Sequence, residues 1–225
     1  SSAASDVYKR QVYIRFLTKC INNFNLYGLH VVEGNAGHTF CMGEIIIMNY
    51  MDIKRCDIAN GTGVRTSLFV SGCTHHCKGC FNQDTWDFNA GKPFTQKEID
   101  TIIELCKPDH IVGLTLLGGE PLEFVNQQGL LPLLEQFKAA YPDKTIWCYT
   151  GYDFEKDVLD KMYFQWDFTH KFLSYLDVLV DGEFVEEKKV LDLRFRGSTN
   201  QRILDVPKSL AAKKAVLWDE KGRYF

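Results

Sequence analysis

The sequence predicts an α/β fold, with a mostly parallel sheet and helices on its outside. Short apolar runs and amphipathic segments alternate between residues 64 and 180, and this order is typical of strands joined by helical crossovers. The chain of 225 residues is 45% hydrophobic and 24% charged, a balance that lets a globular chain bury a core. A folded domain is therefore expected.

The first predicted strand is Val64–Val70, which follows a turn rich in Asn and Gly. The segment 95–106 has the apolar spacing of a helix, and Thr95 followed by Glu98 forms the capping-box pattern. A nearly continuous apolar run at 111–117 predicts the next strand. Together these three segments predict one βαβ unit.

The same alternation continues toward the C-terminus. A helix is expected at 130–141, a strand at Thr145–Tyr149 and a further strand at 176–180, with a mixed region at 154–172. Sheets of this kind carry their chemistry on the loops that follow the carboxyl ends of the strands. Functional residues are therefore expected after positions 70, 117 and 180.

We expect the chain to consist of three parts. Residues 1–47 have no sustained periodicity, and their polar opening at 1–11 resembles an adapter scar, so we expect them to be extraneous, with translation starting at Met48. A genuine N-terminal extension is the alternative. The functional domain is expected at 48–205 and a C-terminal tail at 206–225.

Charge and cysteine usage limit the function classes. Lys and Arg total 26 against 29 Asp and Glu, a net charge of −3, so no basic field favours nucleic acid or an anionic membrane. No apolar run reaches the roughly 18 residues of a membrane span. Eight cysteines without a visible signal peptide favour a reducing cytoplasm, where clustered thiols are more often metal ligands than disulfides.

Three of the thiols are crowded at Cys73, Cys77 and Cys80. Their spacing would suit one face of a helix, but Gly72 and Gly79 are weak helix formers and the run directly follows a predicted strand. A loop is therefore expected. Three thiolates gathered on one short loop need a cation or a metal cluster to neutralise them.

Zinc and an iron–sulfur cluster are the two candidates for this loop. Structural zinc uses four ligands, and the sequence has no second Cys-x2-Cys or His-x3-His pair, so three thiols that leave one coordination position open favour a cluster. His75 and His76 are expected to be exposed and not to be ligands. The other thiols after residue 47 are expected to be buried: Cys56, Cys106 and Cys148.

A second motif follows the strand at 111–117. Gly118, Gly119, Glu120 and Pro121 form a turn that is weak evidence alone, since a glycine pair before proline commonly ends a strand. If the two strands are parallel neighbours, however, this turn and the cysteine loop meet at one edge of the sheet. The missing side chains would let the polar head of a ligand approach the backbone.

The three-cysteine spacing followed by this Gly-Gly-Glu-Pro turn resembles the radical S-adenosylmethionine enzymes. Within that superfamily the chain resembles the activating subunits of anaerobic ribonucleotide reductases, and the resemblance covers roughly residues 48–205. The segments that carry it are MNY (48–50), DIANGTGVR (57–65), SLFVSGC (67–73), CFNQDTW (80–86), WCYTGY (147–152), LVDGEF (179–184) and RGSTNQR (196–202).

The resemblance implies a partial (β/α) barrel of the radical S-adenosylmethionine type and a 4Fe-4S cluster on Cys73, Cys77 and Cys80. S-adenosylmethionine would bind the fourth iron, with Gly118 and Gly119 supporting its amino group. Reductive cleavage would yield methionine and a 5'-deoxyadenosyl radical, which would abstract hydrogen from a glycine of the reductase. The implied activity is that of a radical S-adenosylmethionine oxidoreductase.

Contacts to the rest of the cofactor are expected on the same edge. The resemblance implies adenine contacts from the backbone of Gly79 and Cys80, with the Phe81 ring nearby, although many superfamily members place an aromatic residue where this chain has Gly79. A Phe81 ring buried under the loop is the alternative. Glu120 and Asp181 could bond the ribose or amino group, or could be solvated turn carboxylates.

A polar cluster follows in the chain, and it comprises Arg196, Ser198, Asn200 and Gln201. It could meet the partner or the cofactor carboxylate, and a turn role is equally compatible with these residue types.

The implied partners are the large subunit of an anaerobic ribonucleotide reductase, as protein substrate, and an electron donor such as a flavodoxin. Two other functions stay open at this point. One is activation of a different glycyl-radical enzyme, and the other is a zinc-bearing interaction module without catalysis.

Overall fold

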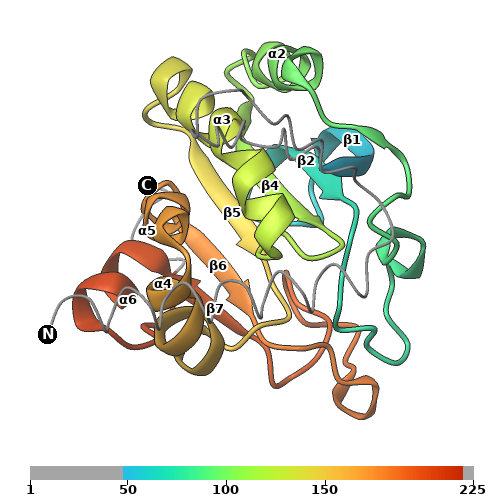
Figure 1. The fold of residues 1–225 in the computed structure, drawn as a ribbon, viewed down its shortest axis with the longest axis vertical. Coiled ribbons are helices and arrows are strands. Elements are labelled where there is room, and N and C mark those ends of the chain that lie inside the picture. Colours follow the sequence, from blue (N-terminus) through green and yellow to red (C-terminus); the bar gives the residue numbers. More distant parts are fainter. Residues whose placement is uncertain (1–47, 220–225) are drawn as a thin grey trace, which may run out of the picture. The chain divides into compact units, whose positions relative to one another are not determined.

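A computed structural model describes residues 48–219, whose strands form a seven-stranded sheet (Figure 1). Its spatial order is β3-β1-β2-β4-β5-β6-β7. The strands are β1 (Asn49–Asp57), β2 (Val64–Val70), β3 (Lys92–Pro93), β4 (Ile111–Gly118), β5 (Thr145–Tyr149), β6 (Val178–Asp181) and β7 (Arg202–Asp205).

The sheet is mixed, so the predicted α/β class is confirmed but the mostly parallel sheet is wrong. The pairs β2·β4, β4·β5 and β5·β6 are parallel, whereas β1·β2, β1·β3 and β6·β7 are antiparallel. The sequence pattern missed β1, β3 and β7 because β3 has two residues, β7 has four, and most of β1 is exposed and polar. The parallel part carries the βαβ units, and the antiparallel strands extend it on both sides.

The helical elements include five α-helices in the described part of the chain. They are α2 (Gln96–Leu105), α3 (Phe124–Ala140), α4 (Tyr163–Gln165), α5 (Asp167–Ser174) and α6 (Val206–Ala212), together with a π-helix η2 (Phe154–Met162) and the 3-10 turns η1 (Gln83–Thr85) and η3 (Glu186–Lys188). Helices α2, α3, α5 and η2 pack on one face of the sheet through a common apolar cluster.

The alternation of side chains along β5 and β6 explains this arrangement. Ile146 and Cys148 of β5 point into the helix-covered core, while Trp147 between them belongs to a second cluster on the opposite face. That second cluster includes Val178 and Val180 of β6. The helices therefore cover one face of these strands, and the other face packs against loop and C-terminal segments.

Most of the predicted elements are present. The bounds of β2 and β5 match, β4 is one residue longer than expected, and the strand expected at 176–180 is β6. In α2 the Glu98 carboxylate accepts hydrogen bonds from the Thr95 amide (2.9 Å) and hydroxyl (2.5 Å), as the capping-box pattern predicts. Helix α3 begins six residues before position 130, because the segment Asn-Gln-Gln-Gly at 126–129 interrupts the apolar pattern after Phe124 and Val125.

The predictions for the two ends of the chain have different outcomes. The prediction for 1–47 lies outside the described residues. Within the expected tail, α6 packs on the sheet, since Val206 is buried in the core and Leu204 pairs with Leu217. Within residues 48–219 no helix combines the length and the apolar content needed to cross a bilayer.

Arg65 ties the three central strands together at the end opposite the loops of interest. It is fully buried in β2, and its guanidinium donates to Thr115 Oγ1 (2.8 Å) and Leu114 O (2.9 Å) of β4. It also donates to Thr145 O (2.7 Å) of β5. One rigid, planar donor group thus satisfies oxygens on the adjacent strand β4 and on β5 beyond it.

Arg65→Met is expected to lower the free energy of unfolding by at least about 3 kcal/mol, because several buried oxygens lose their donor. Arg55→Met, on the exposed part of β1, is the matched control and should change it by less than about 0.5 kcal/mol. Urea denaturation followed by fluorescence measures both. Equal effects of the two substitutions would contradict a central role of Arg65.

Candidate functional site

The candidate site is formed by the segments that follow β2, β4, β5 and β6. These strands are consecutive parallel neighbours, so their carboxyl ends lie at one edge of the sheet (Figure 1). The segments at that edge are 71–91, 119–123, 150–153 and 182–201. Each contains residues that the sequence singled out.

The cysteine segment is a loop, as predicted, whose only helical part is η1. Cys73 is buried, and Cys77 and Cys80 are half-buried. The loop closes on itself through backbone hydrogen bonds, since Gly72 N donates to Thr85 O (2.8 Å) and Cys73 N donates to Trp86 O (3.0 Å). The first cysteine is therefore held on a defined backbone path.

The Gly-Gly-Glu-Pro turn lies directly against this loop. Gly119 N donates to Val70 O and Glu120 N donates to Gly72 O, both at 2.8 Å. Asn126, buried in α3, adds a bridge, because its Nδ2 donates to Ser71 O (3.0 Å) and to Glu120 O (2.8 Å). The expected convergence of the two loops is thus present in atomic contacts.

These contacts explain why both positions are glycine, and the explanation differs from the one that the sequence suggested. A Cβ on Gly119 would collide with Gly72 O and lie 3.0 Å from Thr85 O, both backbone atoms of the cysteine loop. Gly118 has a φ of 110°, and a Cβ there would lie 2.8 Å from the backbone of Val70. The space left by the missing side chains is filled by the protein's own backbone, which differs from the open approach path that the sequence suggested.

The three thiols do not have the spacing of a single-ion site. A tetrahedral zinc site with Zn–S bonds of about 2.3 Å places its sulfurs about 3.8 Å apart. Among residues 48–219, one set of three candidate ligand atoms lies mutually within 4.8 Å, and it does not include Cys73, Cys77 and Cys80. Thiolates that each bind a different iron atom of one cluster stand farther apart than ligands of one ion.

The electrostatics of the loop also call for a cationic group. Burial, together with the nearby Glu120 carboxylate, raises the pKa of the Cys73 thiol to about 12. Burial and Glu183 raise the pKa of the Cys77 thiol to about 11. Both thiols stay protonated near neutral pH unless a metal group displaces the protons, as metal binding to cysteine does.

Glu120 and His75 lie in unexpected surroundings. Glu120 was considered a solvated turn carboxylate, but its side chain is 1% exposed and accepts from Leu122 N (2.8 Å) and Gly151 N (2.7 Å). His75 was expected to be exposed, but its side chain is 15% exposed, with Nε2 3.2 Å from Glu120 Oε2. His76 is exposed, as expected, and stacks on Trp86.

The connection between β6 and β7 lies beside the second half of the cysteine loop. Lys78 Nζ pairs with a carboxylate oxygen of Glu186 at 3.0 Å, and a Cβ on Gly79 would meet the same glutamate. The Phe81 ring packs at a tilt on Phe184, with centroids 5.3 Å apart. Phe81 is nevertheless 64% exposed, so the alternative of a ring buried under the loop is wrong.

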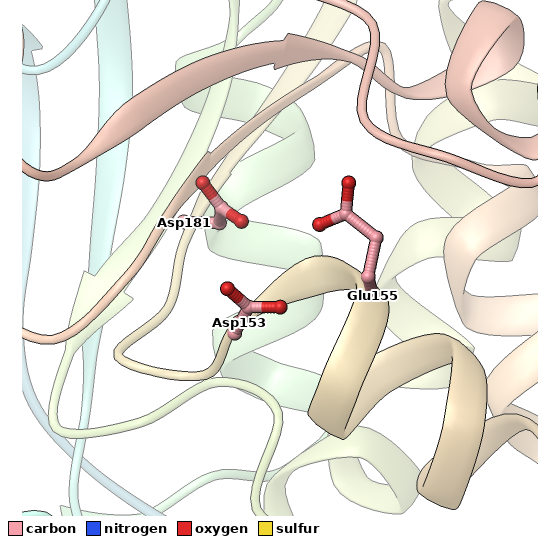
Figure 2. Close-up of side chains that lie close together, drawn as sticks. All are labelled: Asp153, Glu155 and Asp181. Atoms are coloured by element: carbon pink, nitrogen blue, oxygen red, sulfur yellow. The ribbon is translucent and has the colours of Figure 1, made fainter.

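Asp181 ends β6 and belongs to a carboxylate cluster with Asp153 and Glu155 (Figure 2). Arg202 offsets part of the negative charge of this cluster, since its guanidinium pairs with Asp181, with Glu155 (2.7 Å) and with Asp153 (3.6 Å). Asp181 and Glu155 raise the pKa of Arg202 further above its ordinary value. Asp181 is buried and not a solvated turn residue, and the cluster is an internal ion-pair network.

The polar residues at 196–201 mainly bond to one another and to the neighbouring turn. Gln201 Oε1 accepts from Gly197 N (2.8 Å), and Arg196 donates to Gln201 O (2.8 Å). Asn200 Nδ2 donates to Glu183 O (2.8 Å). These contacts support the turn role that was one of the two options for the cluster.

The remaining thiols of the described part differ in their surroundings. Cys106 and Cys148 are buried in the core, as predicted. The prediction that Cys56 is buried is wrong. It lies on β1 beyond the two residues that pair with β3, so this part of β1 is a sheet edge.

Comparison with known proteins identifies a matching family and several similar proteins. The family model for a 4Fe-4S single cluster domain matches residues 59–204. The chain is 46% identical over 158 residues to the anaerobic ribonucleoside-triphosphate reductase-activating protein of Haemophilus influenzae, which covers 69% of this chain and 97% of that protein. The protein of the same name from Escherichia coli K12 is 42% identical over 156 residues, which are 68% of this chain and 96% of that protein. The one from phage T4 is 39% identical over 156 residues, which are 69% of this chain and 93% of that protein.

Gly119→Ala is expected to displace the cysteine loop, because the added Cβ has no room against the Gly72 carbonyl. We expect at least a tenfold faster amide hydrogen exchange at 72–77 than in the unsubstituted protein. Ala139→Gly, near the end of α3, is the control for a general loss of stability and should leave that exchange unchanged. Unaltered exchange in Gly119→Ala would show that the loop tolerates a side chain there.

Proposed function

The chain belongs to the 4Fe-4S single cluster domain family and to the anaerobic ribonucleoside-triphosphate reductase-activating proteins, and from this premise we propose that it is a glycyl-radical activase. Its protein substrate is the large subunit of an anaerobic ribonucleotide reductase. The reaction is one-electron cleavage of S-adenosylmethionine, which makes the protein a radical S-adenosylmethionine oxidoreductase. The observation that carries the proposal is the loop with three cysteines held against the Gly-Gly-Glu-Pro turn.

Cys73, Cys77 and Cys80 are the proposed ligands of the 4Fe-4S cluster. Three thiols on one loop, without the spacing of a single-ion site, leave one iron free for a substrate. When a cluster is bound there, the chemistry that it supplies is electron transfer to the sulfonium, which splits S-adenosylmethionine into methionine and a 5'-deoxyadenosyl radical.

The remaining residues of this edge bind and orient the cosubstrate. The backbone of Gly118 and Gly119 lies beside the cysteine loop and is proposed to meet the amino group of S-adenosylmethionine. The backbone at Gly79 and Cys80, with the exposed Phe81 ring, is proposed to lie against the adenine. Glu120 and Asp181 are already bonded inside the protein, so their part in this binding is indirect.

The sheet arrangement supports a protein-sized substrate. The helices pack on one face, and the sheet runs from β3 at one edge to β7 at the other, which is compatible with a partial (β/α) barrel. We propose that the reductase covers the carboxyl ends of the parallel strands, where the cysteine loop lies, and presents its glycine to the radical. A reduced carrier such as a flavodoxin would supply the electron, and these steps would occur in the cytoplasm.

Cys77→Ala is expected to lose the cluster and the activity together, because two thiolates hold a cluster poorly. After anaerobic reconstitution, iron and sulfide per chain should fall at least tenfold, and the glycyl-radical signal of the reductase in paramagnetic resonance should vanish. Cys56→Ser, which changes an exposed thiol, should retain both.

Two outcomes would contradict the proposal. A colourless protein that binds zinc in place of iron and sulfide would indicate a structural metal module. A radical signal on another glycyl-radical enzyme, with none on the reductase, would keep the chemistry and replace the partner.

A further inference from the structure

Two of the three residues between Cys73 and Cys77 are held by glutamates of a single neighbouring segment. Thr74 contacts Glu123, and His75 contacts Glu120. We propose that Glu123, supported by Glu120, is a positioning residue that fixes the backbone between the first two cysteines. The positioning of the loop does not depend on the proposed function. Only its expected effect on the stability of the bound cluster rests on that function.

Glu123 makes the stronger of the two contacts. Its Oε1 accepts hydrogen bonds from the Thr74 amide at 3.0 Å and from the Thr74 hydroxyl at 2.5 Å. The Tyr152 hydroxyl donates to the same oxygen at 3.3 Å. All three partners direct a donor at one oxygen of a buried side chain, so this oxygen acts as an acceptor, while burial raises the pKa of the Glu123 carboxyl.

The position of Glu123 in the fold indicates that this contact is specific. Glu123 is the N-cap residue of α3, yet its side chain makes no hydrogen bond to the first turn of that helix. N-cap side chains usually accept from these free amides. Here the carboxylate reaches the cysteine loop, while the positive end of the 17-residue helix still stabilises its charge.

Glu120 and Gly151 enclose the next residue of the loop. The His75 ring lies edge-on to the Tyr152 ring, with centroids 4.4 Å apart, and its Nε2 faces Glu120. A Cβ on Gly151 would lie 2.6 Å from His75 Cδ2, so only glycine leaves room for the imidazole. His75 therefore occupies a fitted space between the segments that follow β4 and β5.

The consequence concerns the first cysteine. Thr74 and His75 follow Cys73 directly in the chain, so they set the path of the backbone that leaves the first cysteine. His76 has a φ of 51°, so the chain turns sharply just before Cys77. Fixing Thr74 and His75 thus fixes the backbone that joins Cys73 to the sharp turn before Cys77.

Amide hydrogen exchange of the full chain, without and with reconstituted cluster, tests the positioning. Glu123→Ala removes the acceptor, and exchange at 74–77 should become at least tenfold faster. Glu123→Gln keeps an acceptor oxygen and should stay within about threefold of the unsubstituted protein. Glu135→Ala, on an exposed part of the same helix, is the matched control and should not change this exchange.

The effect on the cluster is measured as the half-life of the bound cluster in the presence of an iron chelator. This half-life should shorten at least tenfold in Glu123→Ala and be restored in Glu123→Gln. Unchanged exchange in Glu123→Ala, or exchange in Glu123→Gln as fast as in the alanine variant, would overturn the inference. Because exchange is also measured without cluster, a protein that never binds iron would refute the proposed function and leave this result intact.

Discussion

The close approach of two backbone segments at the carboxyl edge of the sheet is the constraint on which the site depends. The hydrogen bonds from Gly119 to Val70 and from Glu120 to Gly72 leave no room for a side chain at position 119. Because β2 and β4 are parallel and adjacent, the loop that begins at Ser71 and the turn after Gly118 leave the sheet side by side. Asn126 then closes the remaining gap from the helix.

Negative charge around the thiols, buried at Glu120 and Glu123 and exposed at Glu183, is the second feature that shapes the site. Glu120 and Glu123 are held by hydrogen-bond donors beside Cys73, and Glu183 lies near Cys77. Such an environment disfavours free thiolates and favours a bound cationic metal group. The same carboxylates hold the loop, so the electrostatics of the site and its geometry are linked through the same side chains.

Local patterns predicted the elements whose signal is strong along the chain. Strands β2 and β5 are buried apolar runs with matching bounds, and α2 carries its own capping box in Thr95 and Glu98. Strand β1 was missed because most of its residues are polar, and the start of α3 was missed because residues 126–129 interrupt its apolar pattern. Their structure is decided by pairing with β2 and by packing on the core, which no local window contains.

The sequence by itself determined the identity and spacing of the three thiols, the loop that carries them and its expected meeting with the glycine turn, since these follow from local chemistry and from the order of strands. Only the tertiary structure decided that Glu120 is buried against Gly151, that Glu123 reaches Thr74, and that Asp181 pairs with Arg202. The physical reason is that a carboxylate's role depends on which donors the fold brings to it across tens of residues, and residue type alone does not specify those donors.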